Sequence, residues 1–134
     1  MIKKRILVDL SFTLPHHGHI RLLKKASEYG KVIVALTSDK EVLKYKGYTP
    51  ELNYSSRKEI LISIKYVDEV IQSHWLITNK FLEKNKIDFL LHGEDNSNQI
   101  DKKKLILVKR TEGISSSVIR KKSYLNYKKI LKKF

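Results

Sequence analysis

Two histidines with a glycine between them stand just after an apolar run and just before a helical pattern. His16 and His19 enclose His17 and Gly18, which gives an H-x-G-H spacing. Two imidazoles so spaced at a strand-to-helix turn can address one anionic group together, and the glycine lets the backbone come close. The first amides of the following helix favour phosphate at the same place, whereas a metal site would need further ligands from another loop. The cluster predicts phosphate chemistry carried by His16 and His19, with His17 incidental.

A second polar segment with phosphate-binding residue types, RTEGISSS, begins at Arg110. Arg110 offers a planar fork of donors that suits phosphate oxygens. Gly113 permits an unusual backbone angle or a close approach. Ser115 and Ser116 can cap the next helix and donate hydroxyls to phosphate, and Arg120, one turn further on, can reach the same region. The segment predicts a second phosphate-binding element.

Two more polar stretches carry groups that could act on a nucleotide. Lys44 and Lys46 lie in a long polar connection at 39–55, where a mobile lysine can close over a triphosphate or can simply be solvated. His92 and Asp95 belong to the stretch HGEDNSN. A carboxylate there can hold a nucleoside hydroxyl, an amine or a metal, or it can bond its own backbone turn.

The elements that must position these groups follow from hydrophobic periodicity and turn signals. Ser55 or Ser56 is expected to cap a helix whose Ile60 and Leu61 side chains point inward. The last helix could be interrupted near Ser123. Strands are expected at 4–10, 31–38, 67–71, 87–91 and 105–108, and helices at 18–29, 55–65, 76–86 and from about 115 to 134.

This alternation of strands and helices predicts an α/β fold, a doubly wound parallel sheet of about five strands with helices on both faces. The H-x-G-H segment falls at the first strand-to-helix turn. The other polar segments also follow strands, and ligands of such sheets bind at the carboxyl ends of the strands. We therefore expect the polar segments to meet at one edge of the sheet.

Length and charge bound the remaining possibilities. The chain of 134 residues predicts a single domain, 1–134, ending in a basic helix at about 122–134. The chain has no cysteine, which excludes disulfides and thiolate metal sites and fits a reducing cytoplasm. No stretch reaches the length that spans a bilayer. The net charge is +14, and 12 Lys and Arg against 2 Asp and Glu place +10 of it at 101–134. A basic end of this kind can bind nucleic acid, an anionic membrane or an acidic substrate, or can be a solvated helix.

With these segments in place, the chain resembles the cytidylyltransferase branch of the H-x-G-H nucleotidyltransferases nearly end to end. The resemblance is carried by LPHHGHIRLLKKASEYG, ALTSDKEVLKYKGY, YSSRKEILISIKYVDEVI, FLLHGED and RTEGISSS. The chain is most similar to glycerol-3-phosphate, ethanolamine-phosphate, choline-phosphate and aminoethylphosphonate cytidylyltransferases. The resemblance implies a compact Rossmann-like domain, a dimer, and the use of CTP with Mg²⁺.

The resemblance also implies roles for individual residues. It implies catalytic roles for His16, His19, Lys46 and Arg110. It implies nucleotide contacts from Leu10, Ser11, Phe12, Gly18, His92, Asp95, Thr111, Gly113, Ile114, Ser115 and Ser116. It implies phosphate or substrate contacts from Lys44, Arg57 and Arg120, and it leaves metal ligands open. One departure precedes the histidines, because Thr13 stands where the family keeps an aspartate.

The sequence therefore predicts a CTP-dependent cytidylyltransferase. It would transfer CMP to a small phosphorylated alcohol, amino alcohol or phosphonate and release pyrophosphate. A homodimer is expected, nucleic acid is not an expected partner, and the basic C-terminus can contact a membrane surface. The alternatives are an adenylyltransferase of the same fold and a nucleotide-binding module with weakened catalysis, which Thr13 motivates.

Overall fold

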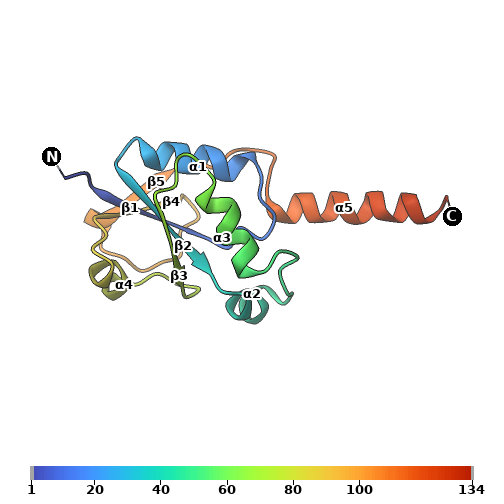
Figure 1. The fold of residues 1–134 in the computed structure, drawn as a ribbon, viewed down its shortest axis with the longest axis horizontal. Coiled ribbons are helices and arrows are strands. Elements are labelled where there is room, and N and C mark those ends of the chain that lie inside the picture. The colour runs from blue at the N-terminus through green and yellow to red at the C-terminus, as the bar shows by residue number, and fades with distance from the viewer. Residues whose placement is uncertain (1, 134) are drawn as a thin grey trace.

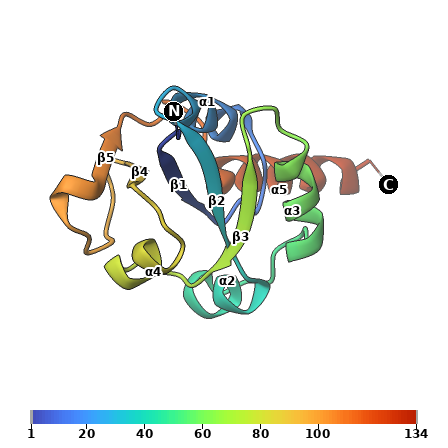
Figure 2. The same cartoon turned by 60° about the vertical axis from the view of Figure 1, so that its left-hand side comes forward.

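The computed structural model describes residues 2–133 and contains a five-stranded parallel sheet flanked by helices (Figure 1). The strands lie in the order β3-β2-β1-β4-β5, so the chain crosses back over β1 between β3 and β4. Figure 2 shows β1, β2 and β3 side by side. The strands are β1 (Arg5–Leu10), β2 (Lys31–Thr37), β3 (Glu69–Ser73), β4 (Phe89–Gly93) and β5 (Leu105–Val108). The predicted doubly wound α/β fold is confirmed.

Helices cover both faces of this sheet because its strands are apolar on both sides. Along β1, Ile6 and Val8 pack on the face covered by helices α1 and α3, whereas Leu7 packs on the opposite face with Leu82 of helix α4. All of these side chains are fully buried. The helices are α1 (His17–Ser27), α2 (Asp39–Lys46), α3 (Tyr54–Ile62), α4 (Asn79–Lys84) and α5 (Ser116–Leu131), with a 3₁₀ turn at Lys102–Lys104.

The connection predicted to be a loop at 39–55 contains a helix, which corrects the sequence reading. Ser38 caps α2 by accepting a hydrogen bond from the Glu41 amide at 3.2 Å. Gly47 ends the helix in a left-handed conformation with φ of 82°. The helix buries only Val42, so its sequence carries little hydrophobic periodicity to reveal it.

Several predicted boundaries are displaced. Asn53, not Ser55 or Ser56, caps α3, and Ile60 is exposed while Leu61 is buried. Strands β3 and β4 begin two residues later than predicted, at Glu69 and Phe89. Helices α1 and α4 are bounded by His17–Ser27 and Asn79–Lys84. The apolar residues before β3 and β4 pack on the core without entering the sheet ladder, so periodicity alone places these strands too early.

Helix α5 projects from the body of the protein (Figure 1). It runs without a break through Ser123, contrary to the possibility raised by the sequence, and none of its residues is buried. Its lysines from Lys122 onward lie within the basic segment predicted at about 122–134, of which Phe134 is outside the described residues. No helix between residues 2 and 133 combines the length and the apolar composition needed to cross a bilayer.

Candidate active site

A cavity of about 710 Å³ opens where the carboxyl ends of the strands meet. Such a volume suits a nucleotide-sized ligand. Most of the residues singled out from the sequence line it, although they come from segments far apart in the chain. These are Leu10, Ser11, Phe12, His16, Gly18, His19, Lys46, His92, Asp95, Arg110, Thr111, Ile114, Ser115 and Ser116.

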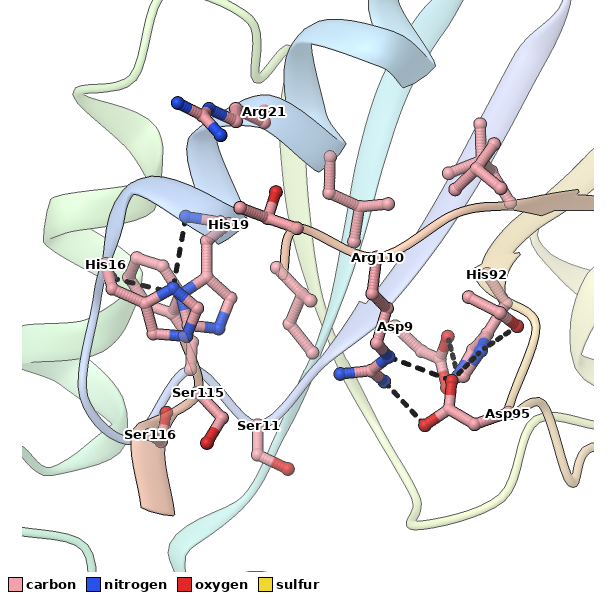
Figure 3. Close-up of a pocket in the computed structure, with 18 of the residues that line it drawn as sticks. Asp9, Ser11, His16, His19, Arg21, His92, Asp95, Arg110, Ser115 and Ser116 are labelled. Atoms are coloured by element: carbon pink, nitrogen blue, oxygen red, sulfur yellow. Dashed lines mark hydrogen bonds and ion pairs between the residues drawn. The ribbon is translucent and has the colours of Figure 1, made fainter. Parts of the chain in front are cut away.

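The two histidines form the N-terminal cap of α1, and the cap fixes how each ring is protonated. The Gly18 amide donates to Nδ1 of His16 at 3.1 Å, and the His16 amide donates to Nδ1 of His19 at 3.2 Å (Figure 3). A neutral imidazole whose Nδ1 accepts a hydrogen bond carries its proton on Nε2. No hydrogen bond within residues 2–133 uses Nε2 of either ring. Each ring can therefore donate an N–H bond to a ligand.

Packing holds the two rings together. The ring centroids of His16 and His19 are 3.8 Å apart, and Phe12 meets His19 edge-on at 4.8 Å. A Cβ atom on Gly18 would lie 2.9 Å from the His16 ring, so only glycine leaves room for the imidazole at this position. The spacing recognised in the sequence thus produces a closely packed, tilted pair of donors at a helix N-terminus.

Burial keeps both imidazoles neutral. Desolvation, with the neighbouring His16 imidazole and the positive charges of Arg110 and Lys46, lowers the pKa of His19 from 6.5 to about 3. Desolvation also lowers the pKa of His16, aided by His17 and Arg110. The same positive charges prepare the site for an anion, which would relieve the repulsion.

This pKa shift makes stability depend on pH. Unfolded His19 takes up a proton below pH 6.5, whereas folded His19 does so only at about 3. Between these values the unfolded state binds more protons, so the free energy of unfolding falls as the pH drops through this window. We expect urea denaturation at about pH 7 and about pH 5 to show this loss, and His19→Gln to reduce it. An unchanged pH dependence in His19→Gln would contradict the shift.

A line of ionisable side chains crosses the other side of the cavity, over β1, β4 and the segment after β5. Arg110 binds Asp95 through Nε and a terminal nitrogen, each at 2.9 Å (Figure 3). His92 lies between two carboxylates, with Nδ1 at 3.9 Å from Asp95 and Nε2 at 3.5 Å from Asp9. Burial acts to raise the pKa of Asp95, but hydrogen bonds and charge from Arg110 outweigh it and lower that pKa.

Asp9, in strand β1, is a cavity residue that was not singled out from the sequence. Its Oδ2 accepts a bond from the Asn98 amide at 3.3 Å, while its buried Oδ1 has no hydrogen bond. Burial raises the pKa of Asp9 despite the opposing charge of His92. A carboxylate inside a buried strand was the available signal, because such a group needs a partner at the strand end.

The end of α2 and the segment after β3 form another part of the cavity lining. Trp75 stacks on Tyr45 with ring centroids 5.2 Å apart, and Nζ of Lys46 lies 5.9 Å from the Trp75 ring centroid. Lys46 and Trp75 both line the cavity. Trp75, which was not singled out from the sequence, packs on Tyr45 and also faces the site. The contact between Tyr45 and Trp75 could not be predicted, because the sequence did not reveal helix α2.

Four residues predicted to bind ligand do not line the cavity: Lys44, Arg57, Gly113 and Arg120. Arg57 is fully buried and its guanidinium binds protein groups, which corrects its predicted contact with phosphate. Arg120 is paired with Glu51 at 3.0 Å. Lys44 is exposed beside Tyr45, and Gly113 provides a left-handed turn with φ of 76°.

Thr13, which replaces a family aspartate, is completely buried. Its hydroxyl lies 3.2 Å from the hydroxyl of Tyr48, and Tyr48 also accepts a hydrogen bond from Arg120 at 3.2 Å. Thr13 therefore anchors the turn before the histidines to the α2–α3 connection. It places no carboxylate in the cavity.

The residues described do not form a resident metal centre. Within residues 2–133, no three His, Cys, Asp or Glu side chains gather in a way that could hold a metal ion. Of the cavity carboxylates, Asp9 and Asp95 are each engaged by a neighbouring side chain. Such a donor set fits Mg²⁺ only if ligand phosphates supply most of the coordination.

Comparison with known proteins agrees with this arrangement. A family model described as cytidylyltransferase-like matches residues 8–122. A glycerol-3-phosphate cytidylyltransferase of Staphylococcus aureus is 35% identical over 126 residues, covering 90% of this chain and 96% of the relative. A probable choline-phosphate cytidylyltransferase of Schizosaccharomyces pombe is 40% identical over 127 residues, covering 84% of this chain but 35% of the relative.

One solved structure shows the same fold. The lipopolysaccharide core biosynthesis protein of Thermoplasma volcanium superposes with a TM-score of 0.68 at 21% identity, covering 81% of this chain and 98% of that one. The family match spans both the histidine turn and the RTEGISSS segment that form the cavity. The chain belongs to the cytidylyltransferase-like family and is a nucleotidyltransferase.

Proposed function

We propose that this protein transfers CMP from CTP to a small acceptor bearing a phosphate or phosphonate, and releases pyrophosphate. The observation that carries the proposal is the pair of closely packed, neutral imidazoles with free Nε2–H donors at the N-terminus of α1. An oxygen of the acceptor attacks the α-phosphorus of CTP, and the bond from that phosphorus to the β-phosphate oxygen breaks. The electron pair of the broken bond leaves with pyrophosphate.

Phosphoryl chemistry of this kind needs positioning and charge stabilisation more than covalent help. His16 and His19 are placed to donate hydrogen bonds to oxygens that gain charge at the α-phosphorus. Lys46 approaches from the β2–β3 side and Arg110 from the β5 side, and together they oppose the negative charge of the triphosphate. Mg²⁺ would arrive bound to the CTP phosphates and neutralise part of their charge.

The nucleoside end of CTP is assigned to the β4–β5 side of the cavity. His92, Asp95, Thr111 and Ile114 line that side. Asp95 offers a carboxylate that can accept from a cytosine amine or a ribose hydroxyl once Arg110 turns toward phosphate. The names of the relatives favour CTP over ATP, since both are cytidylyltransferases.

The assay is incubation with each of the four nucleoside triphosphates and a panel of phosphate esters and phosphonates, while pyrophosphate is followed. We expect release that requires both CTP and an acceptor. A preference for ATP would instead support an adenylyltransferase. Tight CTP binding by calorimetry with no turnover would support a binding module that has lost catalysis.

We further propose a homodimer, as the family resemblance implies. Helix α5 supports it by exposing an apolar stripe of Tyr124, Tyr127, Ile130 and Leu131, each more than half exposed. Sedimentation is expected to give twice the chain mass of 15.7 kDa. A chain-mass species at micromolar concentration would contradict the dimer.

We also propose that α5 contacts an anionic membrane surface, because the helix is rich in lysine. The helix and its C-cap carry Lys121, Lys122, Lys128, Lys129 and Lys132 and no acidic residue, and each lysine near an anionic leaflet is attracted to it. Co-sedimentation with vesicles containing anionic lipid, but not with neutral vesicles, is the expected result. We place the enzyme in the cytoplasm, where CTP is available.

A further inference from the structure

The end of helix α2 carries Lys46 to the cavity, but the hydrophobic core holds this part of the chain only loosely. Val42 is the only buried side chain of α2, and the next buried residue along the chain is Pro50. A lysine that opposes the charge of a triphosphate needs a fixed position, because a displacement of about 1 Å near the reacting atoms can cost about 100-fold in rate. Contacts other than core packing must therefore fix Lys46.

Tyr48, two residues beyond Lys46, makes such a contact through its hydroxyl. The hydroxyl oxygen lies 3.2 Å from Oγ1 of Thr13 and 3.2 Å from Nη1 of Arg120. A guanidinium has donors only, so the Tyr48 oxygen accepts from Arg120 and its own proton is left for Thr13. This hydroxyl bridge of Thr13, Tyr48 and Arg120 joins three segments: the turn before the histidines, the α2–α3 connection and helix α5.

Arg120 is itself fixed by the α2–α3 connection. Its Nε and Nη2 donate to the two carboxylate oxygens of Glu51 at 3.1 and 3.0 Å. Its guanidinium carbon lies 4.2 Å from the centroid of the Tyr48 ring, which is within cation–π range. A bidentate pair of this kind has a specific geometry. Arg120 therefore holds the Tyr48 hydroxyl in one orientation.

The other end of the hydroxyl bridge belongs to the turn that places the histidine pair. Thr13 is completely buried and follows Phe12, whose φ of 53° is left-handed. This conformation costs a residue other than glycine free energy and persists only where its surroundings hold it. The Phe12 ring in turn meets His19 edge-on. Tyr48 thus ties the peptide after Lys46 to the same turn that positions His19.

Lys46 and His19 act on the same space. Both line the cavity, and the charge of Lys46 is one of the causes that lower the pKa of His19. Neither Tyr48 nor Thr13 lines the cavity, so an effect of Tyr48 on a ligand must pass through another residue.

We propose that Tyr48 is a positioning residue for CMP transfer, whose hydroxyl bond to Thr13 holds Lys46 in a fixed place opposite the histidine pair. The inference rests on the proposed function. It also gives the departure at position 13 a purpose. The Thr13 hydroxyl ends the bridge inside the protein, so a threonine here supports catalysis rather than weakening it.

A double-mutant cycle tests whether Tyr48 acts through Lys46. Tyr48→Phe removes one hydroxyl and is expected to lower kcat/KM for CTP, at saturating acceptor, about tenfold. In a Lys46→Met background the same change is expected to lower it less than about twofold, because no ammonium remains to be positioned. An equal loss in both backgrounds, as a general effect on the fold would give, overturns the inference. So does the absence of a loss in the wild-type background.

Two variants of Thr13 test the other end of the hydroxyl bridge. Thr13→Val keeps the shape but removes the hydroxyl, and we expect it to lower kcat/KM as much as Tyr48→Phe does, with no further loss when the two are combined. Thr13→Ser keeps the hydroxyl and is expected to stay within about threefold of wild type. Tyr29→Phe, at an exposed position outside the cavity lining, is the matched control. Equal losses in Thr13→Ser and Thr13→Val would show that packing, not the hydrogen bond, matters.

A measurement without turnover distinguishes this inference from the proposed function. Trp75 is the only tryptophan in the sequence, and Tyr45, the residue before Lys46, stacks on it at 5.2 Å. Loosening the end of α2 in Tyr48→Phe is therefore expected to increase the quenching of Trp75 fluorescence by acrylamide, whereas Tyr29→Phe is not. Absence of pyrophosphate release by the wild type with every acceptor would overturn the proposed function. Quenching in Tyr48→Phe identical to that of the wild type would overturn the inference, whatever the turnover.

Discussion

Replacing His19 by alanine is expected to lower kcat for CMP transfer about 100- to 1,000-fold, the usual cost of removing one preorganised donor to a developing oxyanion. The physical reason is the fixed tautomer, because Nδ1 of His19 accepts the His16 amide and leaves the proton on Nε2. Steady-state kinetics with CTP and an acceptor phosphate give the measurement. A fall of less than about tenfold, equivalent to ~1.4 kcal/mol of barrier, would remove His19 from its assigned role.

Two further variants separate chemistry from folding. His19→Gln keeps an oxygen that can accept the His16 amide, as glutamine does in a capping box. It should therefore restore most of the stability lost in His19→Ala without restoring kcat. His17→Ala is the matched control, because His17 is exposed, next to the catalytic pair and outside the cavity lining. Its kcat is expected to stay within about twofold of wild type.

Arg57→Met is expected to reduce the free energy of unfolding by ~2–5 kcal/mol, because it leaves buried carbonyl oxygens unpaired at ~1–3 kcal/mol each. The guanidinium is fully buried and donates to the Ser11 carbonyl, and to the Thr37 carbonyl at 2.9 Å. It also pairs with Asp39 at 2.6 Å. Its removal leaves these carbonyls without a donor at the ends of β1 and β2. Urea denaturation followed by circular dichroism is the measurement.

Arg120→Met is the comparison for Arg57→Met. Arg120 also pairs with a carboxylate, Glu51, but its side chain is 29% exposed and that of Glu51 is 50% exposed. Pairs of this kind contribute ~1 kcal/mol or less. A loss in Arg57→Met no larger than the loss in Arg120→Met would contradict the structural role given to Arg57.

The parts of the site that could be predicted are those encoded within a few adjacent residues. The H-x-G-H spacing places two rings on one turn at a helix start, and the same turn supplies the amides that orient them. Likewise, Ser115 caps α5 by accepting from the Val118 amide at 3.1 Å. Such short-range geometry depends little on the rest of the fold. The strand-to-helix alternation was similarly local, and it predicted the parallel sheet.

The parts that could not be predicted depend on partners distant in the chain. Arg57 binds groups of Ser11 and Thr37, 46 and 20 residues away, so its sequence neighbours gave no sign that it would be buried. Asp9 meets Asn98 across 89 residues. The contact between Tyr45 and Trp75 needs α2, whose short, mostly exposed surface carries weak periodicity.

The central claim is that an acceptor oxygen attacks the α-phosphorus of CTP in this cavity. The most direct measurement is ³¹P NMR of a reaction between CTP and an acceptor phosphate labelled with ¹⁸O. The account predicts a CMP-linked product with label in the bridge between its two phosphorus atoms, together with unlabelled pyrophosphate. CTP that remains unchanged with every acceptor, or label that appears in pyrophosphate, would contradict it.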